Sequence, residues 1–147
     1  ASHISKRYPV EKLAKLTTVL DANFFVIWGN SNEKILANDI KALAPQVKVC
    51  NQLSIDALIS LIKKIDLVIG PDTGPSHIAW ALNIPSITLF GSTPGYRNTC
   101  ITNINKIIES DSYVNPKNIN KNDRSIKNIK VSDISNLAYD LLGTIKK

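Results

Sequence analysis

The stretch DLVIGPDTGPSHIAWALNIPSITLFG, residues 66–91, decides the fold. It begins with a short apolar run that is typical of a buried strand, and a second run of the same kind, residues 85–91, ends it. Between the two runs, small and apolar residues have helical spacing from about Pro75 to Leu82. A strand, a helix and a second strand in this order predict a βαβ unit with parallel strands.

The same alternation continues along the rest of the chain. Residues 102–130 are the exception, because they are rich in Asn and Lys. We expect one short strand in this segment, followed by a solvated, mobile loop over 110–130. The whole pattern predicts a Rossmann-like, three-layer α/β/α domain with a parallel sheet, formed by a single domain over 1–147. The other elements that we expect are helices over 9–20, 30–44, 54–65 and 132–145 and strands over 23–28 and 47–50.

The triplet Asp72-Thr73-Gly74 has two very different interpretations. It is the triplet of aspartic proteases, but those enzymes bring two copies together in an all-β setting. This chain has one copy, and helical spacing follows it. The protease interpretation is therefore disfavoured.

A parallel sheet gives the triplet another use. Ligands of such sheets bind beyond the carboxyl ends of the strands, where Asp72 is expected. Backbone N–H groups of Thr73 and Gly74 would then form an anion site at the start of the helix. The alternative is that Asp72 only caps this helix. His77 is expected to pack or to form a hydrogen bond, because a metal site would need further ligands nearby.

Composition narrows the class of protein. The chain has 147 residues, of which 44% are apolar and 20% charged, so a packed domain is expected. No apolar stretch reaches the roughly 18 residues of a membrane span, and we expect a cytoplasmic protein. Cys50 and Cys100 have no CxxC partner and are expected to be buried thiols.

The net charge of +6 favours anionic partners, and 15 of the 18 basic residues are lysine. These partners could be nucleotide phosphates, nucleic acid or an anionic membrane face. No stripe of arginines interleaved with aromatic residues is present, so nucleic acid is not the favoured partner.

Four segments, in order along the chain, carry a family resemblance. Residues 66–95 contain an apolar strand, Asp-Thr-Gly, Ser-His, a short helix, a Pro-led strand and Gly-x-Thr at Gly91. Residues 52–69 lead to this stretch, and SKRYP and VIWGNSNE precede it. Together they resemble the lipopolysaccharide heptosyltransferases, which are GT-B glycosyltransferases that use ADP-heptose: residues 66–95 resemble the donor-binding signature, SKRYP the Lys-x-aromatic-Pro turn, and VIWGNSNE the Trp-Gly-x-x-x-Glu element.

The resemblance implies specific roles. It implies inverting transfer of heptose from ADP-heptose to the Kdo of the lipopolysaccharide inner core, with no cofactor and no metal, and heptosyltransferase I is the nearest subtype. The absence of an Asp-x-Asp motif agrees with metal independence. The implied contacts are Lys6, Thr73, Gly74 and Ser2 with the diphosphate, Glu33 with the ribose, Leu53 with the adenine, and Asp72 and His77 with the sugar.

The chain departs from the family in length. GT-B enzymes have two Rossmann-like domains, and this sequence resembles only the C-terminal, donor-binding one. The acceptor domain, with the family's catalytic base, is absent, so we expect the chain alone to be inactive. The acceptor, Kdo-lipid A, implies peripheral contact with the cytoplasmic face of the inner membrane. The alternatives are a UDP-sugar enzyme of the 2-epimerase or N-acetylglucosaminyltransferase type, a nucleotide-binding module without activity, and a purely structural domain.

Overall fold

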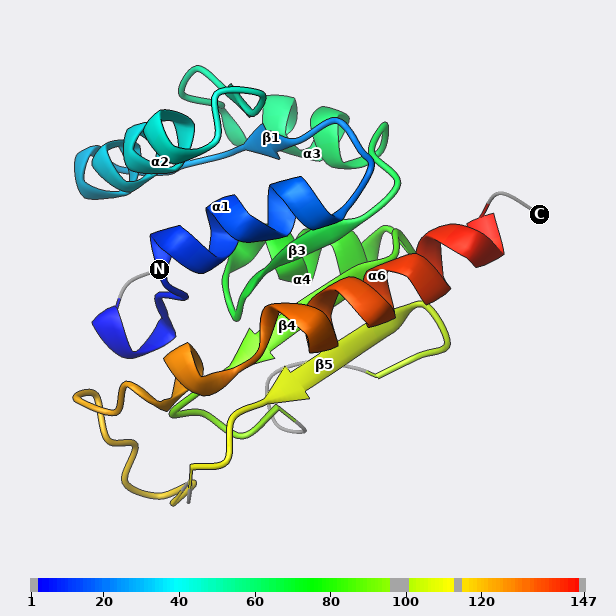
Figure 1. The fold of residues 1–147 in the computed structure, drawn as a ribbon. Coiled ribbons are helices and arrows are strands. Elements are labelled where there is room, and N and C mark those ends of the chain that lie inside the picture. The colour runs from blue at the N-terminus through cyan, green and yellow to red at the C-terminus, as the bar shows by residue number, and fades with distance from the viewer. Residues whose placement is uncertain (1–2, 96–100, 113–114, 146–147) are drawn as a thin grey trace.

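The computed structural model describes residues 3–95, 101–112 and 115–145. The chain alternates helices and strands, as the sequence predicts (Figure 1). Along the first half the elements are η1 (Ile4–Lys6), α1 (Val10–Val19), β1 (Phe25–Val26), α2 (Ser31–Leu43), β2 (Lys48–Val49) and α3 (Ile55–Ile62). The second half contains β3 (Val68–Pro71), α4 (Gly74–Ala81), β4 (Ser86–Phe90), β5 (Asn105–Glu109), η2 (Ser125–Asn128) and α6 (Val131–Ile145).

Local sequence accounts for the helix starts. The side chain of Asn30 accepts a hydrogen bond from the Glu33 N–H at the start of α2, and Ser54 accepts one from the Ala57 N–H at the start of α3. Pro9 precedes α1, where its missing N–H removes no helical hydrogen bond. The predicted helices therefore begin within a residue or two of their predicted positions.

All strand pairs are parallel. β4 lies between β3 and β5, with Ile87 opposite Ile69 on one side and opposite Lys106 on the other. β1 and β2 form a separate two-residue ladder, and no ladder joins them to β3 within the described residues. We expected one parallel sheet, whereas the strands form two parallel sheets, β1–β2 and β3–β4–β5.

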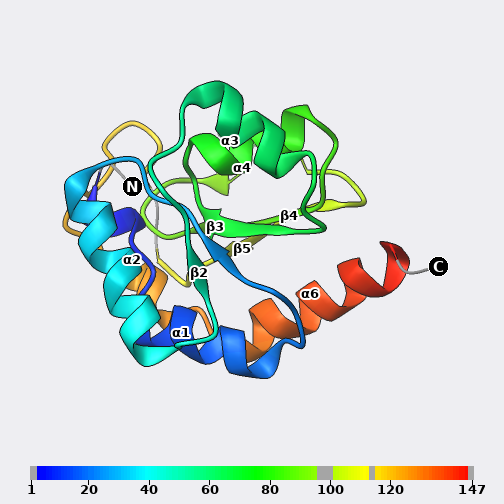
Figure 2. The same ribbon diagram turned by 90° about the horizontal axis from the view of Figure 1, so that it is seen from above.

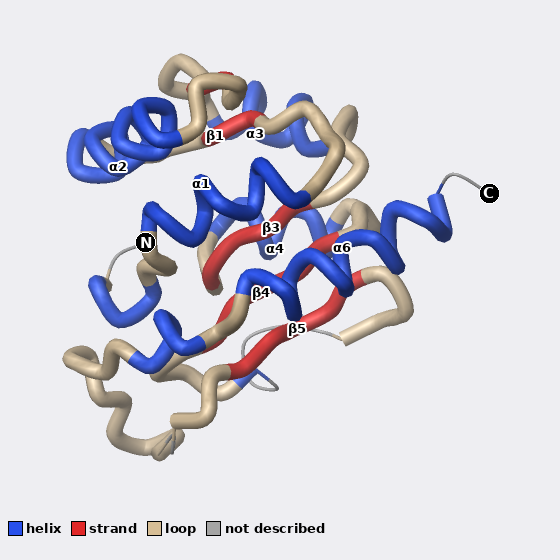
Figure 3. The backbone as a smooth tube through the Cα atoms, viewed as in Figure 1, coloured by secondary structure: helices blue, strands red, loops and turns tan. Residues whose placement is uncertain are grey.

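Helices cover both faces of the three-stranded sheet. Figure 2 shows α3 and α4 on one side of β3 and β4, and α1 and α6 on the other. Figure 3 shows the same helices and strands as a tube, viewed as in Figure 1. Every residue of β4 is buried, as expected of a central strand with two covered faces. The α/β fold and its three layers agree with the prediction, and the largest core cluster includes Leu16, Ile87, Leu89, Ile134 and Leu141.

Residues 115–122 of the predicted loop are exposed, as expected of a solvated segment, but two residues near its end are buried. Ile126 and Ile129 are 1% and 4% exposed and belong to the main core. The buried Tyr8 hydroxyl donates to the Ile129 carbonyl at 2.9 Å, and the Lys12 ammonium donates to the same oxygen at 2.9 Å. Burial and Asp133 raise the pKa of Tyr8 to about 12, so its hydroxyl remains a donor at neutral pH. Thus η1, α1 and η2 are tied together at one end of the domain.

Gly91 is where these segments meet the central strand. A Cβ at this position would lie 2.8 Å from Ile126 Cβ and 3.1 Å from the Ser5 carbonyl oxygen. Only the missing side chain lets both segments approach the end of β4 this closely.

Replacing Gly91 by alanine should therefore destabilise the fold, by about 1–3 kcal/mol, because the new methyl group overpacks the site. Gly143 in α6 is the matched control, since a Cβ there meets nothing within 4 Å. Gly143→Ala should stabilise the chain by about 0.5–1 kcal/mol. Urea unfolding measures both, and equal effects for the two variants would contradict the packing described at Gly91.

Candidate functional site

The predicted site residues follow the carboxyl ends of the strands. The arrows of β1, β4 and β5 point in the same direction in Figure 1. Glu33 follows β1, Leu53 follows β2, and Asp72 follows β3 directly. Lys6 reaches the same edge from η1. This edge is where parallel sheets bind their ligands.

Lys6, Asp72 and His77 form a hydrogen-bonded cluster. The Asp72 carboxylate is almost fully buried, with its side chain 6% exposed. Lys6 Nζ lies 2.9 Å from Oδ2, and His77 Nε2 lies 2.8 Å from Oδ1. Lys6 Nζ also donates to the Asp72 carbonyl oxygen at 3.3 Å. Asp72 thus orients a lysine and a histidine that are themselves 20% and 43% exposed.

This arrangement limits the charge that the cluster offers to a ligand. The Asp72 carboxylate and the Lys6 ammonium carry opposite charges, so the pair offers a ligand no net charge. An ammonium group has three N–H donors, and the two contacts with Asp72 leave one for a ligand. An anion at this cluster would therefore depend on directed N–H groups as much as on net charge.

The start of α4 supplies such N–H groups. Thr73 is the N-cap residue of α4, and its side chain forms no capping hydrogen bond. The Asp72 carboxylate contacts the side chains of Lys6 and His77, so capping α4 is not its sole use. The Thr73 and Ser76 hydroxyls instead donate to the Pro71 carbonyl oxygen, at 3.3 and 2.9 Å. Gly74 is exposed, and a Cβ there would meet nothing within 4 Å. The backbone at Gly74 is therefore open to a ligand.

Glu33 takes part in capping α2. Its Oε2 accepts from the Gly29 N–H at 2.7 Å, while its own N–H donates to Asn30 Oδ1 at 3.0 Å. Partial burial raises the pKa of the Glu33 carboxyl, but hydrogen bonds, among them those from the N–H groups of Gly29 and Asn30, bring it below its usual value. Glu33 is therefore an ionised acceptor at neutral pH. Leu53 is half-buried and precedes the Ser54 cap of α3.

Some predicted residues lie outside this description, and some contacts were not predicted. Ser2 and Cys100 fall outside the described residues, and Cys50 is a half-buried free thiol whose pKa is raised by burial.

The Trp28 indole N–H donates to the Cys50 carbonyl at 2.8 Å and so links the segments that carry Glu33 and Leu53. The Lys6–Asp72 pair spans 66 positions and has no local sequence pattern.

Two classes of feature are absent from the part of the chain that the structure describes. No group of three or more His, Cys, Asp or Glu side chains is placed to hold a metal ion. No helix is both long and apolar enough to cross a bilayer.

Comparisons with known proteins identify the family and the fold. The sequence profile of glycosyltransferase family 9 (heptosyltransferase) matches residues 1–128. Lipopolysaccharide heptosyltransferase 1 of Campylobacter coli is 40% identical over 153 residues, which cover 97% of this chain and 45% of that protein. The chain therefore spans under half the length of this relative.

Two solved structures share the fold. The structure of E. coli heptosyltransferase WaaC with ADP superposes with a TM-score of 0.81 at 18% identity, covering 96% of this chain and 42% of that one. The structure of the same enzyme with ADP-2-deoxy-2-fluoro heptose gives a TM-score of 0.76 at 18% identity, with 95% and 40% covered. Because the family profile covers most of the chain, and a relative 40% identical covers nearly all of it, the chain belongs to glycosyltransferase family 9, the heptosyltransferases.

Proposed function

We propose that the chain is the donor-binding part of an enzyme that transfers heptose from ADP-heptose to the Kdo of the lipopolysaccharide inner core, with inversion and without a metal ion. The observation that carries the proposal is the cluster of Lys6, Asp72 and His77 at the carboxyl end of β3, beside the open start of α4. Family membership supports heptose transfer as the reaction. The ADP named for the E. coli structure supports an adenine nucleotide.

The proposed reaction exchanges one bond at the heptose anomeric carbon. An acceptor hydroxyl oxygen forms a bond to this carbon, the bond to the β-phosphate oxygen breaks, and ADP leaves with the electron pair. Negative charge then develops on the diphosphate, which fixed N–H donors stabilise best when they are already oriented. Lys6 and the N–H groups of Thr73 and Gly74 are such donors.

The other residues of the site position the donor. Glu33, held ionised by hydrogen bonds, accepts from the ribose hydroxyls, and Leu53 lies against the adenine. Asp72 contacts Lys6 and His77, so its first role is to orient them, and its second is to accept a hydrogen bond from a sugar hydroxyl. His77, the most exposed of the three, contacts the sugar.

The acceptor's proton needs a base within hydrogen-bond reach. None of the assigned residues takes that role, so we place the base, and the Kdo-lipid A site, in sequence that the longer relatives have and this chain does not span. The 147-residue chain alone should then transfer no heptose to Kdo-lipid A. An acceptor at the cytoplasmic face of the inner membrane fits the net charge of +6, because anionic lipids attract basic surfaces.

Lys6→Ala should weaken ADP binding by about 1.5–3 kcal/mol, the usual range for a hydrogen bond to a charged group. Adenosine, which has no phosphate, should bind equally well to the variant and the parent chain in titration calorimetry. Because the substitution also leaves Asp72 short of a partner, unfolding is measured beside binding, and Lys6→Ala/Asp72→Asn removes the unpaired charge. Parallel losses for ADP and adenosine would show that Lys6 acts on folding alone.

Gly74→Ala tests the approach of the diphosphate to the backbone. The new methyl group meets no protein atom, so stability should be unchanged or slightly higher. If the diphosphate lies against the start of α4, ADP affinity should fall severalfold while adenosine affinity stays the same. Gly143→Ala, far along α6, is the control that should bind both ligands like the parent chain. Unchanged ADP affinity in the Gly74 variant would move the diphosphate away from α4.

The nucleotide specificity separates this proposal from the UDP-sugar alternative. ADP should bind more tightly than UDP and GDP, and EDTA should change none of the three affinities, because the proposed contacts are Lys6 and backbone N–H groups. Calorimetry with the three nucleotides, with and without EDTA, measures this. Preference for UDP would favour the sugar-nucleotide enzymes of the alternative.

A further inference from the structure

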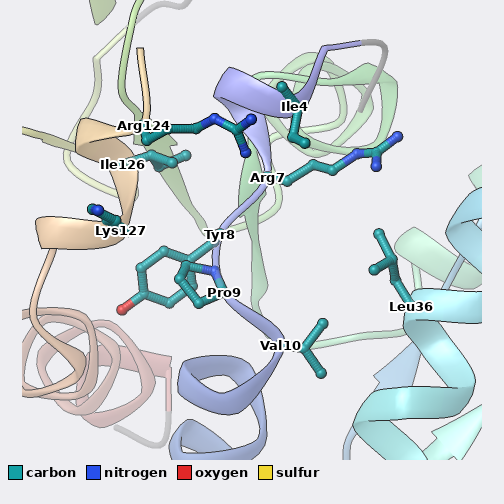
Figure 4. Close-up of a pocket in the computed structure, with 9 residues that line it drawn as sticks. All are labelled: Ile4, Arg7, Tyr8, Pro9, Val10, Leu36, Arg124, Ile126 and Lys127. Carbon is teal, nitrogen blue, oxygen red and sulfur yellow. The ribbon is translucent and has the colours of Figure 1, made fainter. Parts of the chain in front are cut away.

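A hollow at the end of the domain is distinct from the Lys6–Asp72–His77 cluster. It has a volume of about 340 Å³ and lies where η1, α1, α2 and η2 come together (Figure 4). Its apolar wall comes from Ile4, Tyr8, Val10 and Leu36. The basic side chains of Arg7, Arg124 and Lys127 also line it, and no described lining residue is acidic.

The arginines are the unusual feature of this lining. The chain has 15 lysines and only three arginines, and two of the three are here. Figure 4 shows Arg124 extending from η2 toward Ile4 and the stem of Arg7, while Arg7 extends toward the α2 side that carries Leu36. A guanidinium offers a planar fork of donors that matches the oxygens of a phosphate, which a lysine cannot do.

The donors of Arg7 are not used by the described protein. Its Nε is buried and has no hydrogen-bond partner within the described residues. A buried donor without a partner costs about 1–3 kcal/mol, and more when it belongs to a charged group. Because this Nε is shielded from solvent, a ligand reaches it only when the Arg7 side chain turns, and a hydrogen bond to an anion then supplies the missing partner.

We propose that this hollow binds a phosphate group carried by a partly apolar molecule. The phosphate lies against the fork of Arg124, the Arg7 side chain turns toward it on binding, and the apolar part lies against Ile4, Tyr8 and Leu36. Lys6 and Arg7 are neighbours in sequence, but Lys6 reaches Asp72 whereas Arg7 lines the hollow. The site therefore does not depend on the proposed donor site, and either could fail without the other.

NMR spectroscopy of the arginine Nε–H groups tests this site directly. The chain gives at most three such signals, and Arg7→Gln and Arg124→Gln assign two of them by removal. Titration with hexyl phosphate, at ionic strength held constant with NaCl, should shift the Arg7 and Arg124 signals with saturation. Hexyl phosphate should bind severalfold more tightly than inorganic phosphate because its chain contacts the apolar wall.

Matched variants distinguish specific binding in the hollow from nonspecific electrostatic attraction to the basic surface. Arg124→Gln, at an exposed position that should not affect folding, should weaken hexyl phosphate about tenfold or more, equivalent to about 1.4 kcal/mol. Lys15→Gln removes the same charge from an exposed position on α1 outside the lining and should change the affinity less than twofold. Arg124→Lys keeps the charge without the fork and should be intermediate. Lys6→Ala should bind hexyl phosphate like the parent chain.

The possible results are distinct. Loss of ADP binding in Lys6→Ala, with hexyl phosphate binding intact, supports two separate sites. Shifts of the Arg7 and Arg124 signals by ADP in that same variant would identify a nucleotide as the phosphate source, and shifts by hexyl phosphate alone would identify a lipid-like one. Signals that do not move, or equal losses in Arg124→Gln and Lys15→Gln, would overturn the proposal.

Discussion

The close approach of two segments at Gly91 is the constraint on which both sites depend. β4 is the central, fully buried strand, and at its carboxyl end Gly91 leaves room for the Ser5 carbonyl on one side and Ile126 on the other. The first contact holds η1, which carries Lys6 to Asp72 at the end of the neighbouring strand β3. The second holds η2, which carries Arg124 to the hollow beside η1. A single missing side chain therefore sets the geometry of two sets of basic residues at the same edge of the domain.

The buried Asp72 carboxylate links folding to the ligand binding that we propose for this site. A charge taken out of water is tolerated only when partners satisfy it, and breaking a buried pair costs more than forming it gains. Lys6 and His77 satisfy one oxygen each, so the site residues also stabilise the domain. Because Lys6 serves both purposes, any ligand that draws it away from Asp72 does so at a cost in protein–protein hydrogen bonds. A donor that uses the one N–H left on Lys6, together with the N–H groups at the start of α4, avoids that cost.

Sequence patterns predict the elements well, because each element is decided by local spacing and capping. Residues 9–20 and 30–44 contain α1 (Val10–Val19) and α2 (Ser31–Leu43) almost to the residue. The contacts between elements were less predictable. The β1–β2 ladder covers only Phe25 and Val26 on its first strand, because pairing depends on partners that a local apolar run does not reveal. Ile126 was expected in a solvated loop because its neighbours are polar, but packing against η1 and β4 buries it. The Lys6–Asp72 pair joins residues too distant in sequence for any spacing rule.

Residues 6–8 show how one short turn serves three purposes. Lys6 reaches the buried carboxylate of Asp72, Arg7 lines the basic hollow, and the Tyr8 hydroxyl donates to the Ile129 carbonyl. Arg7 leaves η1 with extended backbone angles, φ −89° and ψ 113°, and along an extended chain successive side chains point to different sides. In the Lys-x-aromatic-Pro pattern that this turn resembles, Lys6 and Tyr8 occupy the specified positions, and Arg7 occupies the unspecified one. The pattern specifies the lysine proposed for donor binding and the aromatic residue that packs, but it leaves the residue facing the hollow open. The phosphate site proposed on Arg7 and Arg124 can therefore differ between family members that share the same fold.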